Sequence, residues 1–240
     1  MKNSIRLSFA AKLRSAQDLL ANIKEFEGYD PPRPEESVVG FQAQIDSIIA
    51  SNQAESAAVR DYRLLVKERQ EIFFLNSDSI VKMFPVLKEI IKSQYGSKSG
   101  EVAILRTIAN KMRSTKSGVV APVANATDTS VQERSIRQSE KSFAAMTKNF
   151  NDFITVMEGF VDFKPAQEAF KIETLKRTAQ SLTEMNDSIA QKINQLTNVR
   201  FERQQKYIEL SNRFQRIKSF IRAHYGVGSP EYKIAMGFRI

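Results

Sequence analysis

The stretch "SQYGSKSGEVAIL" at residues 93–105 is echoed by "AHYGVGSPEYKIA" at residues 223–235, 130 residues further along the chain. Aligned without gaps, residues 84–101 and 214–231 share seven identities in 18 positions. The identical pairs are Phe84/Phe214, Lys88/Lys218, Ile91/Ile221, Tyr95/Tyr225, Gly96/Gly226, Ser99/Ser229 and Glu101/Glu231. This match predicts an internal duplication.

A second pair of similar segments lies upstream in the same order. "EFEGYDPPRPEE" at 25–36 resembles "VMEGFVDFKPAQE" at 156–168. Two copies at a spacing of about 130 residues are typical of a tandem duplication, because solenoid repeats are shorter and more numerous. The sequence therefore predicts a first helical repeat at 1–113, a flexible linker at 114–134 and a second helical repeat at 135–240, with the two repeats packed together.

The spacing of apolar residues predicts three helices in each repeat, of which the third is long. They cover 8–27, 35–50 and 54–94 in the first repeat, and 138–160, 166–183 and 186–225 in the second. In the first repeat, "FLNSDSIVKMFP" at 74–85 predicts a kink or break, because Asn, Ser and Asp favour caps and turns and Pro85 lacks an amide donor. The predicted fold class is all-α: a helical bundle built from two tandem homologous three-helix units.

The repeated Tyr-Gly-x-x-Ser motif has a structural interpretation. Gly96 and Gly226 are predicted to end the long helices as left-handed caps, since glycine adopts positive φ without steric cost. Ser99 and Ser229 are predicted to cap a short following helix. A role in ligand or partner contact is the alternative for this motif.

The composition narrows the classes of function. The chain has no Cys and a single His, His224, so neither a thiolate site nor a multi-histidine site can form within it. Phosphate-binding, dinucleotide-binding, nucleophile-elbow and zinc-protease motifs are also missing. We expect no catalytic residues, no metal and no cofactor, and therefore a protein that is not an enzyme.

No apolar run approaches the roughly 18 residues that a membrane-spanning helix needs, and the N-terminus lacks the apolar core of a secretory signal. We therefore expect a soluble, cytoplasmic protein.

A basic run on the last long helix is the best candidate for a binding site. With 36 Lys and Arg against 27 Asp and Glu, the chain has a net charge of +9. Such an excess favours phosphate-bearing or other anionic partners. The candidate polyanion contacts are Arg213, Arg216, Lys218 and Arg222. The alternative is a solvated bundle helix, because such charges flank an apolar stripe on both sides.

These observations predict a non-enzymatic helical scaffold or adaptor that binds a protein partner or self-associates through helix faces. The alternative is a protein that binds nucleic acid or another polyanion through the basic helix of the second repeat.

Overall fold

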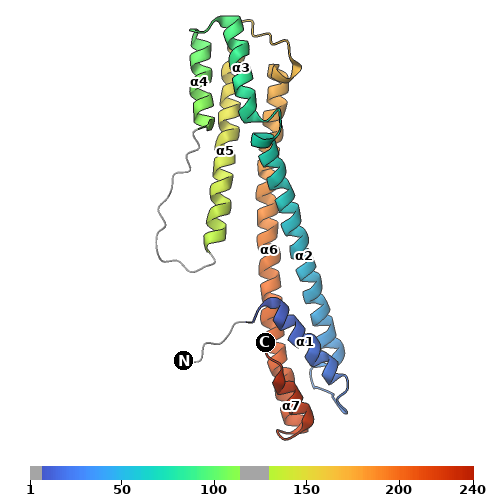
Figure 1. Cartoon of the computed structure of the whole chain (residues 1–240). Helices are drawn as coiled ribbons and strands as arrows, with labels where there is room; N and C mark the ends of the chain where they lie inside the picture. Colours follow the sequence, from blue (N-terminus) through green and yellow to red (C-terminus); the bar gives the residue numbers. More distant parts are fainter. Residues whose placement is uncertain (1–6, 114–129) are drawn as a thin grey trace. The chain divides into compact units, whose positions relative to one another are not determined.

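The computed structural model describes residues 7–113 and 130–240, and every regular element in these ranges is helical. The helices are drawn in Figure 1. The elements in chain order are α1 (Phe9–Ile23), η1 (Pro34–Glu36), α2 (Val38–Gln70), η2 (Glu71–Leu75), α3 (Ile80–Tyr95), α4 (Gly100–Arg113), α5 (Ser130–Glu158), η3 (Glu168–Phe170), α6 (Ile172–Tyr225) and α7 (Pro230–Gly237). The all-α class expected from the sequence is thus confirmed.

The chain folds into two compact units that cut across the sequence. Unit 1 consists of Met1–Asp61 and Ile193–Ile240, and unit 2 consists of Tyr62–Lys192. Both boundaries fall inside long helices, α2 and α6. Each unit therefore contains segments from both the 1–113 and the 135–240 parts of the chain. The predicted linker lies outside the described residues up to position 129, and residues 130–134 begin α5.

Two predicted helix boundaries are wrong. The helices expected at 35–50 and 54–94 are joined through residues 51–53 in α2, and those expected at 166–183 and 186–225 form the single helix α6. Neither 41–84 nor 172–225 contains Gly or Pro, so no residue forces a helix to end there. The predicted short helices are therefore parts of longer ones.

The break predicted at 74–85 is confirmed. The α2 helix passes into the π-helical turn η2, and Asn76–Ser79 then separate it from α3. A π-turn accommodates extra residues within a helix. Pro85 lies inside α3, which continues to Tyr95.

Unit 1 encloses one apolar core. The α1 helix, the first part of α2, the last part of α6 and α7 contribute its buried side chains. These are Ala16, Leu19, Leu20, Ile23, Phe41, Ile45, Ile48, Tyr207, Leu210, Phe214, Ile217, Ile221 and Ala235. Within this unit α2 and α6 run antiparallel, since Asn52 reaches Tyr207 while the earlier Gly40 reaches Arg213.

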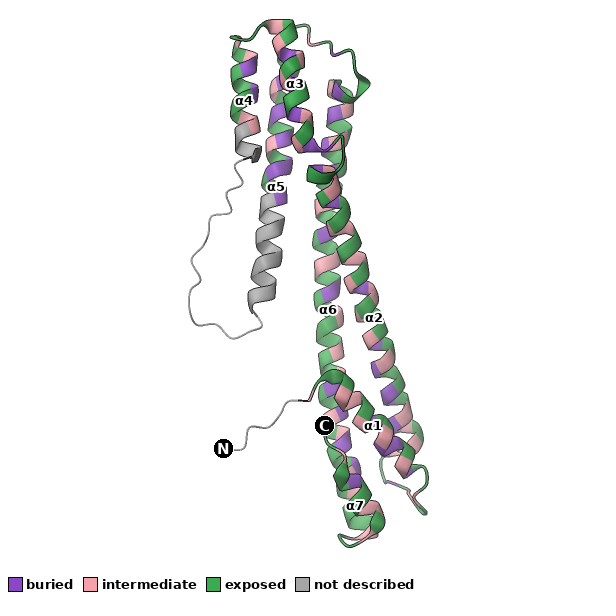
Figure 2. Ribbon diagram, in the orientation of Figure 1, coloured by how far each residue is buried: buried purple, intermediate pink, exposed green. Residues whose placement is uncertain are grey.

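Unit 2 encloses a second core, formed by η2, α3, α4, α5 and the first part of α6. Its buried side chains form continuous stripes on α3 and α5 (Figure 2). They include Phe73, Ile80, Phe84, Leu87, Ile91, Val102, Leu105, Phe150, Phe153, Met157, Leu175 and Leu182.

The two Tyr-Gly motifs have the same local structure. Gly96 and Gly226 follow the last helical residue with φ of +90° and +88°, values that favour glycine. The Ser229 Oγ accepts a hydrogen bond from the Tyr232 amide at 3.0 Å, and the Ser99 Oγ accepts one from Val102 at 3.3 Å.

The tyrosines before these glycines dock in the same way. The Tyr95 hydroxyl donates to the Val161 carbonyl oxygen at 2.7 Å, and the Tyr225 hydroxyl donates to that of Glu27 at 2.9 Å. Each acceptor lies shortly after the first long helix of the other predicted repeat. One expectation fails in this region, because Gly159 does not have positive φ; Asp162, at φ 58°, adopts that conformation instead.

Candidate functional site

The basic residues singled out in α6 mostly bind other parts of unit 1. The Arg213 guanidinium donates to the Gly40 carbonyl oxygen at 3.0 Å, and its burial, followed by the nearby charge of Arg216, lowers the pKa of this group. Gly40 permits this approach: a Cβ there would lie 2.2 Å from the Pro34 carbonyl oxygen. Arg213 therefore fastens α6 to the start of α2.

Arg216 is bound to a buried carboxylate. Its Nε donates to Glu36 Oε1, and Glu36 is only 4% exposed although it carries a charge. The Tyr29 hydroxyl donates to the Glu36 carbonyl oxygen at 2.8 Å. A buried carboxylate is retained where a cation and hydrogen bonds compensate it, so Arg216 is needed in this place.

Lys218 is also engaged internally, whereas Arg222 is exposed. The Lys218 ammonium donates to the Phe238 carbonyl oxygen and lies 5.1 Å from the centre of the Phe214 ring. Burial, then the charge of Arg239, lowers its pKa. Three of the four candidate polyanion contacts thus hold the C-terminal part of unit 1 together, which leaves Arg222 as the most accessible of the four.

Further polar clusters lie along α6 and α2. In unit 1, Glu55 accepts from Arg200 and Arg203, and the Arg203 guanidinium carbon lies 4.8 Å from the centre of the Phe9 ring. In unit 2, Arg69 is 1% exposed and its guanidinium carbon lies 4.0 Å from the centre of the Phe143 ring. Each arginine therefore combines a cation–π contact with polar partners.

These two clusters use corresponding positions. In unit 2, Arg69 donates to Asn186 at 3.2 Å, and Phe73 packs edge-on against Phe143. In unit 1, Asn52 donates to the Tyr207 hydroxyl at 3.0 Å, and Tyr207 stacks on Phe9. The pairs Arg69/Arg203, Phe73/Tyr207, Phe9/Phe143 and Asn52/Asn186 are all separated by 134 residues.

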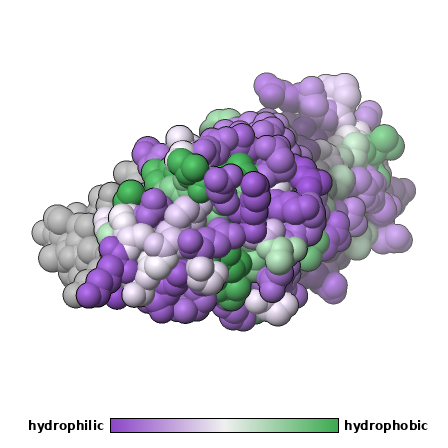
Figure 3. Space-filling model, turned by 90° about the horizontal axis from the view of Figure 1, so that it is seen from above, coloured by the Kyte–Doolittle hydropathy of each residue, from purple (hydrophilic) through white to green (hydrophobic). Residues whose placement is uncertain are grey.

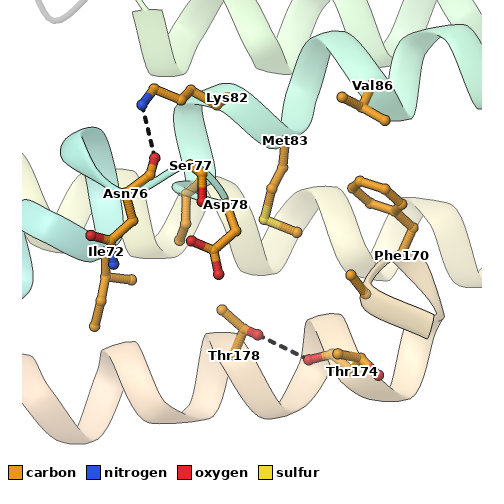
Figure 4. A pocket seen from close by; sticks show the side chains of 12 residues that line it. Ile72, Asn76, Ser77, Asp78, Lys82, Met83, Val86, Phe170, Thr174 and Thr178 are labelled. Atoms are coloured by element: carbon orange, nitrogen blue, oxygen red, sulfur yellow. Dashed lines mark hydrogen bonds between the residues drawn. The ribbon is translucent and has the colours of Figure 1, made fainter. Parts of the chain in front are cut away.

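A small pocket lies in unit 2 beside the break between η2 and α3 (Figure 4). Its volume is about 260 Å³. Its lining combines apolar side chains, among them Ile72, Met83 and Phe170, with the polar residues Asp78 and Thr178. Sequence reasoning identified the break but not this pocket, because its opposite wall comes from η3 and the start of α6.

The corresponding place in unit 1 carries charges. Met83 and Val86 line the pocket in unit 2, and 130 residues later stand Arg213 and Arg216. Phe170 ends η3, and the residue that ends η1, 134 positions earlier, is Glu36. The same framework is therefore apolar in unit 2 and ionic in unit 1.

The described residues offer little for metal chemistry. No group of three or more His, Cys, Asp or Glu side chains in 7–113 and 130–240 is arranged to hold a metal ion. His224 stacks on Phe220 with 5.3 Å between ring centres and packs edge-on against Tyr225. No helix in the described part of the chain has a stretch long and apolar enough to cross a membrane.

The face seen in Figure 3 is mainly hydrophilic, with small separate hydrophobic areas. Comparison with protein-family models, curated proteins and solved structures finds no match to this chain. The inference about function therefore depends on the chain's own contacts.

Proposed function

We propose that this protein is a non-enzymatic helical scaffold, built from two copies of one three-helix repeat, that binds a protein partner or self-associates. The proposal has two parts, the duplication and the binding surface, and different observations support them.

Corresponding local structures support the duplication. Residues 81–91 and 211–221 have the same order of buried, half-buried and exposed positions throughout. The helical turns η1 and η3 precede α2 and α6 in the same way, 134 residues apart. The spacing drops from 134 to 130 across the break at Asn76–Ser79, so the first copy carries four additional residues there.

In this proposal each unit combines parts of both copies. Unit 1 takes α1, η1 and the first part of α2 from the first copy, and the last part of α6 with α7 from the second. Unit 2 takes the complementary parts. Because neither copy contains a whole core, the repeats are intertwined in the manner of a domain-swapped dimer whose subunits became one chain.

One exposed apolar pair carries the proposal of partner binding. Phe201 is 61% exposed and Ile208 is 46% exposed, and both lie on α6 in unit 1. Seven residues make nearly two helical turns, so the two side chains share a face. The exposed Gln204 and Gln205 between them carry no charge. Apolar residues at heptad spacing on a solvent-facing helix are typical of a seam for a second helix.

Mass measurement by light scattering and affinity capture from the native host test this proposal. We expect a mass above that of the monomer, or a specific captured protein, and we expect the paired change Phe201→Ser with Ile208→Ser to abolish it. Val39→Ser is the matched control, since Val39 is 78% exposed in the same unit. A monomer with no captured protein, or a paired variant that behaves like the control, would refute the proposal.

Polyanion binding has less support, because Arg213, Arg216 and Lys218 are engaged within unit 1. Retention on heparin at about 0.15 M salt would revive it, as would a steep loss of affinity with salt. In that case Arg222→Ala should weaken retention without unfolding the protein. The expected cytoplasmic location stays a prediction.

A further inference from the structure

The unit 2 pocket has an apolar floor and a polar rim. Ile72, Ile80, Met83 and Phe170 provide apolar surface, while Asn76, Ser77 and Asp78 come from the break. Figure 4 shows the Asp78 carboxylate on the same side as the Met83 thioether and the Thr178 hydroxyl, facing the pocket. Convergence of a few polar groups on an apolar concavity is the common form of a small-molecule site.

Asp78 is the only acidic side chain that lines this pocket among the described residues. Lys82, the one cationic lining residue there, turns to the break: its ammonium donates to the carbonyl oxygens of Leu75 and Asn76 at 2.9 Å each. No lysine or arginine of the described ranges pairs with the Asp78 carboxylate. The pocket therefore presents an uncompensated negative charge beside apolar surface.

Hydroxyl groups extend the polar rim. Thr178 Oγ1 donates to the Thr174 carbonyl oxygen at 3.0 Å, which leaves its lone pairs able to accept from a ligand. An ammonium group has three donors and no acceptor, so a carboxylate and a neighbouring hydroxyl suit it. A carboxylate ligand would face repulsion from Asp78.

The same place in unit 1 is closed by the protein's own cations. Arg213 and Arg216 stand where unit 2 has Met83 and Val86, and Glu36 accepts from Arg216. In unit 2 the acidic group remains, at Asp78, but no internal cation occupies the space in front of it. The internal ion pair of unit 1 shows which chemistry this framework accepts.

We propose that the unit 2 pocket binds a small primary amine with a short apolar group, its ammonium against Asp78 and its apolar part against Met83 and Phe170. A volume of about 260 Å³ limits the ligand to one smaller than a typical drug. The site is independent of the partner-binding face on α6.

Titration of the full chain with n-hexylamine tests this, with 1-hexanol and hexanoate as matched probes. The readout is the ¹³C-methyl resonance of Met83, assigned through Met83→Leu. We expect hexylamine to shift this resonance in a saturable way, hexanol to bind at least about tenfold more weakly and hexanoate not to bind, because a charge-assisted hydrogen bond is worth roughly that factor.

Two variants localise the effect. Asp78→Asn should weaken hexylamine binding at least about tenfold, whereas Asp30→Asn, which removes an exposed carboxylate in unit 1, should leave it unchanged. Val86→Arg adds a cation at the rim and should also reduce binding, with Val39→Arg as its control. Equal binding of hexanol and hexylamine, an unaffected Asp78→Asn variant, or no shift at Met83 would each overturn the proposal.

Discussion

The buried carboxylate of Glu36 is held by Arg216, which lies 180 residues away on α6. At the corresponding positions unit 2 carries Phe170 and Val86, so an ion pair in one unit is replaced by apolar side chains in the other.

Arg216→Val alone should destabilise the protein by roughly 2 kcal/mol. Loss of one partner of a buried ion pair costs about 3–5 kcal/mol, and the partial solvation of Arg216 reduces this figure. The double variant Glu36→Phe with Arg216→Val copies the unit 2 pair and should recover most of the loss. Urea denaturation measures both, with Arg222→Val as the exposed control on the same helix. A double variant less stable than Arg216→Val would show that the two positions do not correspond.

Arg69→Lys should lower the free energy of unfolding by about 1–2 kcal/mol, because lysine lacks the planar guanidinium that stacks on Phe143 while donating to Asn186. Arg63→Lys, on an exposed part of the same helix, should have an effect within about 0.5 kcal/mol. Denaturant midpoints of the two variants give the comparison. Equal midpoints would contradict the prediction.

Deletion of Asn76–Ser79 should leave the protein folded, with an uninterrupted helix from Val38 to Tyr95. The deletion brings Phe73 and Ile80 to the spacing that Tyr207 and Leu210 have in α6. Circular dichroism should show helix content at or above that of the unmodified chain.

Deletion of residues 76 and 77 alone is the control for this experiment. It turns the following helix by about 200° and moves its apolar face off the core, so it should unfold unit 2. If both deletions unfold the protein, the four residues are not a simple insertion.

Stability should fall at alkaline pH through Tyr29. Burial, followed by the negative charge of Glu36, raises the pKa of this phenol above its ordinary value of 10. A raised folded-state pKa means that the folded state holds its proton longer than the unfolded state. The contribution is therefore complete below pH 10 and is lost as the pH rises above it. Urea denaturation between about pH 9 and 11 should show a shallower decline for Tyr29→Phe; an equal decline would contradict the assignment.

Local features of the fold were predictable from the sequence. Apolar spacing indicated helices, and the Asn-Ser-Asp stretch indicated the break, because both depend on neighbours within a few residues. The joined helices were missed, since polar stretches such as 51–53 resemble connections although nothing in them ends a helix.

The pairing of segments was not predictable in the same way. Apolar stripes show that a helix buries one face, but not whether the partner helix comes from its own repeat or from the other. The partners of Arg213 and Arg216 lie 173 and 180 residues away, so these arginines looked like a solvated basic run. A single signal was present: Glu36 stands where the other repeat places an apolar residue, Phe170.

The contrast between Arg216 and Val86 also bears on evolution. Two identical subunits encoded by one gene must change together, so any substitution appears on both sides of their symmetry axis. Once two such subunits are one polypeptide, each copy accumulates substitutions independently. A fused pair of this kind is free to become asymmetric, keeping one end locked while the other acquires a separate role.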